Sequence, residues 1–155
     1  TQSIPNFAAP KVLNRPHSIT ADVEIPEGGA EGVLLSQGTA AGGYSFYVKD
    51  GTLHYVHNYV GRGWYSVSST DPLPTGTHEL RFEFEPTGPP DLANGKGTPG
   101  RLQLYVDDSL VAAAETPLSD QPMASEIGCR NTASDSIAPK PTQVISAPTA
   151  TTTQP

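Results

Sequence analysis

The sequence G-Y-S-F-Y-V-K-D-G-T-L-H-Y-V-H-N-Y, residues 43–59, decides the fold. Asp50-Gly51 lies at its centre, and a type I′ turn needs positive φ at both central residues, which Asp and Gly tolerate. The flanking residues are largely β-branched and aromatic, as is typical of strands. We therefore expect a β-hairpin in which Lys49 pairs with Thr52 and pairing continues outward, residue by residue.

Side chains alternate between the two faces of a strand, so this register divides the stretch into two sets. The set expected to face the core is Tyr44, Phe46, Val48, Leu53, Tyr55, His57 and Tyr59. The set expected to face outward is Ser45, Tyr47, Lys49, Thr52, His54, Val56 and Asn58. A shift by one residue would exchange the two sets, so burial of the first set should hold this register.

Composition favours one all-β domain with many turns, because the 155 residues include 16 prolines and 15 glycines. The net charge is −7 and the chain has nine Lys and Arg without a basic run, which argues against nucleic-acid binding. The sequence contains neither an apolar run of membrane-spanning length nor a signal-peptide pattern. The single Cys129 cannot form an internal disulfide.

Further strand-like segments, separated by turn signals, surround the central hairpin. We expect them at residues 17–25, 32–37, 64–69, 78–85, 101–107 and 110–114, the last two joined in a hairpin over Asp108-Ser109. Antiparallel strands at this spacing predict a β-sandwich or jelly roll. Residues 86–100 are rich in Pro and Gly, and we interpret them as a surface loop without a role in the core.

The domain organisation follows from composition. Residues 1–16 are expected to be a linker, residues 17–138 the β-sandwich, and residues 139–155 a low-complexity, disordered Thr/Pro tail. Within the second part, residues 123–129 could hold one more weak strand.

Three blocks of this sequence closely resemble the C-terminal domain of bacterial arylsulfatases. They are N-R-P-H-S-I-T-A-D-V-E-I-P-E-G-G-A-E-G-V-L-L-S-Q-G at 14–38, G-G-Y-S-F-Y-V-K-D-G-T-L-H-Y-V-H-N-Y at 42–59, and G-K-G-T-P-G-R-L-Q-L-Y-V-D at 95–107. The resemblance covers roughly residues 10–115, with the blocks in the family's order and spacing. It implies a concanavalin-like jelly-roll β-sandwich that packs against a catalytic α/β domain and takes no part in the chemistry.

The sequence departs from that family in two ways. The family's catalytic domain carries a Cys in a C-x-P-x-R context, whereas Cys129 lies in C-R-N-T-A, so no sulfatase active site can be assigned here. In the family a further strand closes the sandwich, and here either residues 143–146 supply a remnant of it or a sheet edge stays open.

Glu83 and Glu85 are the sequence's best candidates for catalysis. They share one strand face, as the acid and nucleophile of a retaining glycosidase would, at about 5 to 5.5 Å. The solvated face of an amphipathic strand explains them better, because the alternation with Phe82 and Phe84 alone predicts it.

Metal ligands are not expected, and neither is a cofactor. The hairpin register places His54 and His57 on opposite faces, so they cannot bind one ion together. Asp50, Asp107 and Asp108 could suggest calcium, but each lies where a hairpin turn favours Asp.

The candidate binding residues are Tyr47, His54, Val56, Trp64 and Tyr65. Four of them have ring side chains of the kind that concentrates at interfaces and on sugar-binding surfaces, and Val56 is added because it shares the outward face with Tyr47 and His54. Trp64 and Tyr65 are neighbours on one strand, so one of them should face the core.

Three functions remain open: an accessory domain that docks on a sulfatase catalytic domain, a carbohydrate-binding module, and a small glycosidase. The first leads, and it predicts that the isolated chain self-associates.

Overall fold

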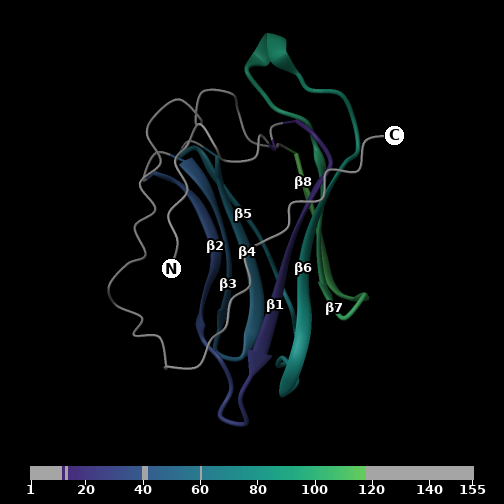
Figure 1. The fold of residues 1–155 in the computed structure, drawn as a ribbon. Helices are drawn as coiled ribbons and strands as arrows, with labels where there is room; N and C mark the ends of the chain where they lie inside the picture. Colours follow the sequence, from purple (N-terminus) through teal and green to yellow (C-terminus); the bar gives the residue numbers. More distant parts are fainter. Residues whose placement is uncertain (1–11, 13, 40–41, 60, 118–155) are drawn as a thin grey trace.

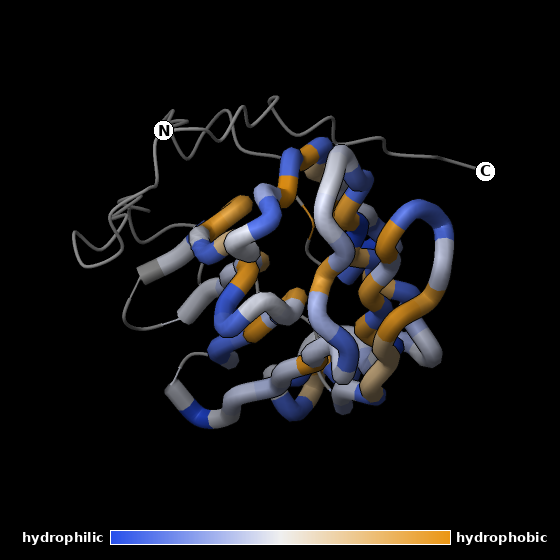
Figure 2. Tube along the Cα trace, turned by 90° about the horizontal axis from the view of Figure 1, so that it is seen from below, coloured by the Kyte–Doolittle hydropathy of each residue, from blue (hydrophilic) through white to orange (hydrophobic). Residues whose placement is uncertain are grey.

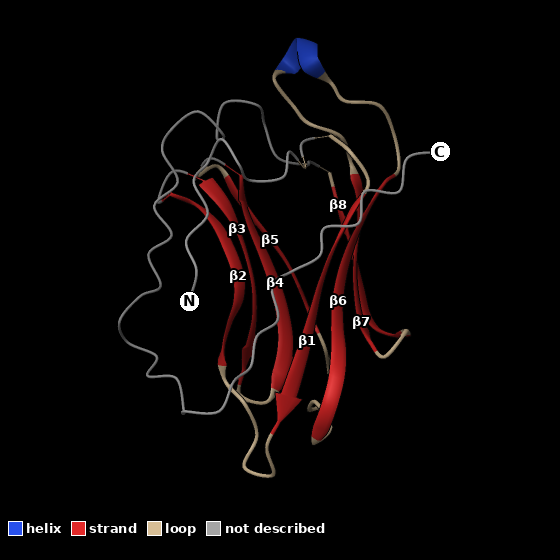
Figure 3. Cartoon of the chain, viewed as in Figure 1, coloured by secondary structure: helices blue, strands red, loops and turns tan. Residues whose placement is uncertain are grey.

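The computed structural model, which describes residues 12, 14–39, 42–59 and 61–117, contains two four-stranded antiparallel sheets packed face to face (Figure 1). One sheet has the order β1 (His17–Ile25), β6 (Gly76–Pro86), β7 (Gly100–Val106) and β8 (Ser109–Thr116). The other has the order β2 (Gly32–Thr39), β3 (Gly42–Lys49), β4 (Thr52–Tyr59) and β5 (Gly63–Ser68). The 3₁₀ helix η2 (Leu92–Asn94) lies in the loop between β6 and β7 (Figure 3). The predicted all-β sandwich is confirmed.

The central hairpin has the predicted register. Lys49 pairs with Thr52, Val48 with Leu53, Tyr47 with His54, Phe46 with Tyr55 and Tyr44 with His57. The φ angles of Asp50 and Gly51 are 50° and 74°, as a type I′ turn requires.

Core side chains come from the inner faces of both sheets. Hydrophobic and hydrophilic residues alternate along the strands (Figure 2). Phe46 and Leu53 of the hairpin are 0% exposed, and Tyr55 is 2% exposed. The Tyr55 ring stacks on Phe82 of the opposite sheet with centroids 3.6 Å apart and an interplanar angle of 7°. This stack and the neighbouring Phe46 therefore join the two sheets at the centre of the core.

The turn of the second hairpin differs from the prediction by one residue. It lies at Asp107-Asp108, with φ angles of 47° and 65°, and Val106 pairs with Ser109. Asp tolerates this left-handed conformation. Asp107 also gains a partner there, because its Oδ1 accepts a hydrogen bond of 2.9 Å from the backbone N–H of Glu79.

The long loop between β6 and β7 is not purely a surface excursion, so that prediction is wrong. Thr98 is 2% exposed, and its N–H and hydroxyl both donate to Oδ1 of Asn14, at 2.9 and 3.2 Å. The hydroxyl of Tyr59 donates to the carbonyl oxygen of Gly95 at 2.7 Å. The loop therefore covers one end of the sandwich, and Asn14, expected in the linker, is tied to it.

Several predictions lie outside the described residues. They are the strand at 123–129, the remnant strand at 143–146, the boundary at 138 and the tail at 139–155. Within the part of the chain that the structure describes, no helix has the length and apolar character needed to cross a membrane.

Candidate binding face

The outer face of the β2–β3–β4–β5 sheet gathers four of the five predicted binding residues. The strand pairing arranges its side chains in rows that run across the sheet. We call these three rows the neutral face: Val33–Tyr47–His54–Ser68, Ser36–Ser45–Val56–Ser66 and Gly38–Gly43–Asn58–Trp64. None of the residues in these three rows is Asp, Glu, Lys or Arg.

Tyr47 and His54 form an ordered aromatic pair in the first row. Their rings stack across β3 and β4 with centroids 5.0 Å apart and an interplanar angle of 14°. His54 Nδ1 lies 2.7 Å from the hydroxyl of Ser68, and its Nε2 lies 2.7 Å from the hydroxyl of Thr52. Both nitrogens of His54 are thus engaged within the sheet, and what the pair offers a partner is ring surface.

Trp64 and Tyr65 of β5 face opposite sides of the sheet, as predicted, and the structure shows which of the two faces the core. Trp64 pairs with Asn58 on the outer face and is 67% exposed. Tyr65 pairs with His57 on the inner face, where it packs against the core. Tyr65 is therefore not part of the neutral face, and its prediction as a binding residue has no support from its position.

Small residues fill the middle of the neutral face. Val56 lies between Ser45 and Ser66 in the second row, and all three are at least partly exposed. In the third row Gly38 and Gly43 pair with each other at φ angles of 138° and 143°. A Cβ on either would come within 2.5 Å of the other's Cα, so neither position can hold a side chain. The third row therefore has no side chain on β2 and β3, and an exposed indole at its β5 end.

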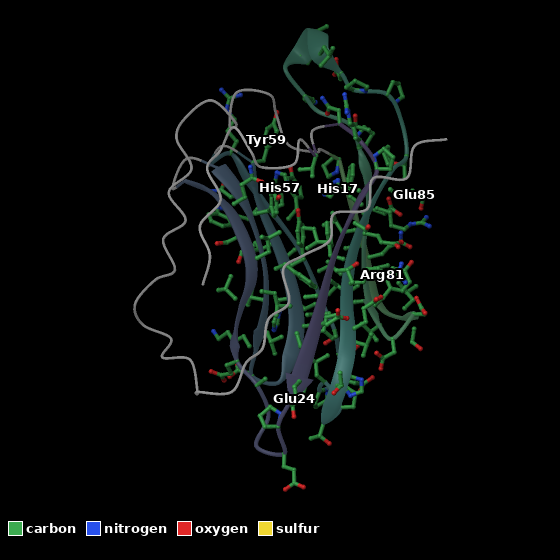
Figure 4. All side chains as sticks on the ribbon, viewed as in Figure 1. His17, Glu24, His57, Tyr59, Arg81 and Glu85 are labelled. Carbon is green, nitrogen blue, oxygen red and sulfur yellow. The ribbon has the colours of Figure 1, made fainter. Side chains whose placement is uncertain are left out.

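The opposite outer face, on the β1–β6–β7–β8 sheet, is densely charged (Figure 4). The Arg81 guanidinium lies 4.4 Å from the centre of the Tyr105 ring. It forms ion pairs with Glu83, with Asp108 at 2.8 Å and with Glu79 at 3.6 Å. This network occupies the middle of the face.

The two glutamates considered for catalysis belong to this charged face. Glu83 is bound by Arg81, and Glu85 pairs across the sheet with Arg101, whose Nε donates to Glu115 at 2.9 Å. The bond to Glu115 raises the pKa of Arg101. Alternation along β6 accounts for both glutamates, and Glu83 also has an ion pair with Arg81, which favours the interpretation as a solvated strand face.

A histidine–aspartate pair stabilises the end of this sheet near the second hairpin turn. His78 Nδ1 lies 2.5 Å from Asp107 Oδ2, and His78 Nε2 lies 3.1 Å from the carbonyl oxygen of Thr75. The hydrogen bond between the two side chains raises the pKa of His78 and lowers the pKa of Asp107. Sequence analysis missed this pair, because it depends on the position of a turn 29 residues away from His78.

Two histidines point into the space between the sheets at the end that the long loop covers (Figure 4). His57 is 6% exposed, which confirms its prediction as a core residue. His17 packs against Phe82 and Phe84, with ring centroids 5.8 and 5.5 Å away. Nearby, burial raises the pKa of the Tyr59 hydroxyl.

No site for a metal ion is formed by three or more His, Cys, Asp or Glu side chains among the described residues. The turn aspartates Asp50, Asp107 and Asp108 all have positive φ, as expected of hairpin turns.

Neither a protein-family model nor a curated protein matches the chain. The fold and the two outer faces define the class of protein, a β-sandwich in which one outer face is densely charged and three adjacent rows of the other lack Asp, Glu, Lys and Arg.

Proposed function

We propose that this chain is a non-catalytic accessory domain of an arylsulfatase-like sulfuric ester hydrolase, and that its neutral face docks on the catalytic domain. The observation that carries the proposal is the absence of charged side chains from the three rows of that face, in a chain with net charge −7. The resemblance of the three sequence blocks supplies the identity of the partner.

Docking through this face has a low desolvation cost. Burying an unpaired charge is expensive, and the centres of protein interfaces are depleted in charged residues for that reason. The neutral face has Val56 near its centre, with the Tyr47–His54 pair and Trp64 around it. Tyr and Trp are enriched among the residues that contribute most to binding. The charged face of the other sheet would remain in solvent.

The proposal assigns no catalytic residue to this chain. Glu83 is bound by Arg81 on a sheet face, and Cys129 lacks the C-x-P-x-R context. The parent enzyme's chemistry would be carried by the catalytic domain alone.

The gene sequence upstream of the codon for Thr1 provides the first test. A single reading frame that carries C-x-P-x-R upstream would support the proposal, and a frame for an unrelated protein would remove its basis. The encoded catalytic domain can then be expressed separately and titrated with this chain. Val56→Glu should weaken that binding, whereas Ala113→Glu should not, because Ala113 is exposed on the opposite face and pairs with Gln103.

The exposure of Trp64 favours a second candidate, a carbohydrate-binding module. An indole that is 67% exposed offers a flat apolar surface to a sugar ring, and the nearby Ser66 and Asn58 offer hydrogen-bonding groups. Trp64 is the only tryptophan of the chain, so its fluorescence reports directly on this face. Saturable quenching or a blue shift on titration with neutral oligosaccharides would favour this candidate, and an unchanged spectrum would exclude those sugars as ligands.

A further inference from the structure

We infer that, when no catalytic domain covers it, the neutral face pairs with the neutral face of a second copy of this chain, about a two-fold axis parallel to the strands. The inference rests on the proposed function in one respect, namely that the neutral face is a binding surface. It adds a specific partner and a specific arrangement.

The shape of the face is complementary to itself in this arrangement. A two-fold axis along the middle of the sheet places β5 of one copy over β2 of the other, and β4 over β3, with each row facing its own symmetry mate. In the third row, the Trp64 indole then lies over Gly38 of the second copy, a position without a side chain. Each copy provides both the exposed indole and the side-chain-free position opposite it, so the same surface is used on both copies, as in a closed two-fold interface.

In the other two rows, the side chains that face each other across the two copies are also compatible. In the first row the ring of His54 faces Tyr47 of the second copy, and Ser68 faces Val33. In the second row Val56 faces Ser45 of the second copy. Aligned sheets pack about 10 Å apart with strands within about 30°, a separation that side chains of these sizes can fill.

Charge favours this arrangement over contact between two copies through their charged faces. The chain carries a net charge of −7, and contact through the charged face would bring together carboxylates such as Glu79 and Glu115. Pairing through the neutral face turns those carboxylates away from each other. Lys49, at the end of the face, would lie over Thr52 of the second copy, so no like charges meet.

The size of the face predicts a weak dimer. Strands six to eight residues long, with spacings of about 4.8 Å across the sheet and about 3.3 Å along it, give the whole outer face of the sheet a footprint of about 400 to 500 Å² per copy, which is an upper bound for the neutral face. The two copies together would bury about 800 to 1,000 Å², below the roughly 1,200 Å² at which stable complexes begin. We therefore expect a dissociation constant on the order of 10⁻⁴ M.

Sedimentation velocity of the full chain from about 10 µM to about 1 mM tests the inference. We expect a reversible shift from monomer to dimer, accompanied by a blue shift of the Trp64 emission as the indole leaves water. Val56→Glu places two like charges beside the two-fold axis and should raise the dissociation constant about tenfold or more. Trp64→Ser should also weaken the dimer, and Ala113→Glu, which adds the same charge on the opposite face, should leave it unchanged. Circular dichroism and thermal melts confirm that each variant folds.

A monomer at every concentration, or a dimer that Ala113→Glu weakens as much as Val56→Glu, would overturn the inference. This outcome is separate from a failure of the proposed function. If the chain stays monomeric but Val56→Glu still loses binding to the catalytic domain, docking stands and the homodimer does not. If the dimer forms and the catalytic domain does not compete with it, the homodimer stands and docking does not.

Discussion

Replacing Phe46 by Ala tests the centre of the sandwich. Phe46 is 0% exposed, pairs with Tyr55 on one side and Leu35 on the other, and lies 6.4 Å from the Phe82 ring of the opposite sheet. Removing a buried phenyl ring leaves a cavity between the sheets, and such changes cost about 3 to 5 kcal/mol of stability. A domain of this size has about 5 to 15 kcal/mol in total, so Phe46→Ala would remove a large part of it.

Urea denaturation, followed by circular dichroism, measures this loss. With a slope of about 2 kcal/mol per M, a loss of about 4 kcal/mol lowers the midpoint by about 2 M. Ser45→Ala is the matched control, because Ser45 is the preceding residue of β3 and faces outward. Its effect should stay within about 0.5 kcal/mol. If the two variants denature at similar urea concentrations, Phe46 does not lie at the centre of the core and the account of the hairpin register is wrong.

Three further predictions concern other parts of the chain. Gly100→Ala should destabilise the domain by about 1 to 3 kcal/mol in thermal or urea denaturation, because its Cβ would come within 2.3 Å of the Phe84 ring. His78→Gln should lower the urea midpoint at about pH 5.5 more than at about pH 9. The hydrogen bond to Asp107 raises the pKa of His78 above 6.5 in the folded chain. The stability that this bond contributes is therefore present below pH 6.5 and is lost as the pH rises through the raised pKa. An equal effect at both pH values would contradict this assignment. The contribution of the pair to stability should also be lost below pH 3.8, as the pH falls through the lowered pKa of Asp107. The purified chain should hydrolyse no aryl sulfate, and turnover that Cys129→Ala abolishes would refute the proposed non-catalytic role.

The central hairpin could be predicted from sequence because two independent local signals agree. Asp50-Gly51 specifies the turn, and alternation around it specifies which residues are buried. Strand β1 was predicted for the same reason, since its apolar and polar residues alternate from Ile19 to Ile25.

The second hairpin was harder, because local preference does not distinguish between two adjacent turns. Asp107, Asp108 and Ser109 all suit turn positions, and the choice is made by contacts of Asp107 with His78 and Glu79 on another strand. The role of the long loop was missed for a related reason. Its anchors to Asn14 and Tyr59 join residues 84 and 36 positions apart in sequence, which no local pattern reveals.

The candidate site was predicted in part. The hairpin register put Tyr47, His54 and Val56 on one face, but the choice between Trp64 and Tyr65 needed the pairing of β5 with β4. The pairing of Gly38 with Gly43 also depends on the register of β2, which a bulge between Val33 and Leu35 shifts by one residue.

The most direct test of the docking account is nuclear magnetic resonance of the ¹⁵N-labelled chain during titration with an arylsulfatase catalytic domain, the partner that we propose. The account predicts that amide signals change along β3, β4 and β5, most strongly around Tyr47, Val56 and Trp64. Signals around Arg81 and Gln103, on the charged face of the other sheet, should stay unchanged. Changes confined to the charged face, or an unchanged spectrum at saturating catalytic domain, would contradict the account.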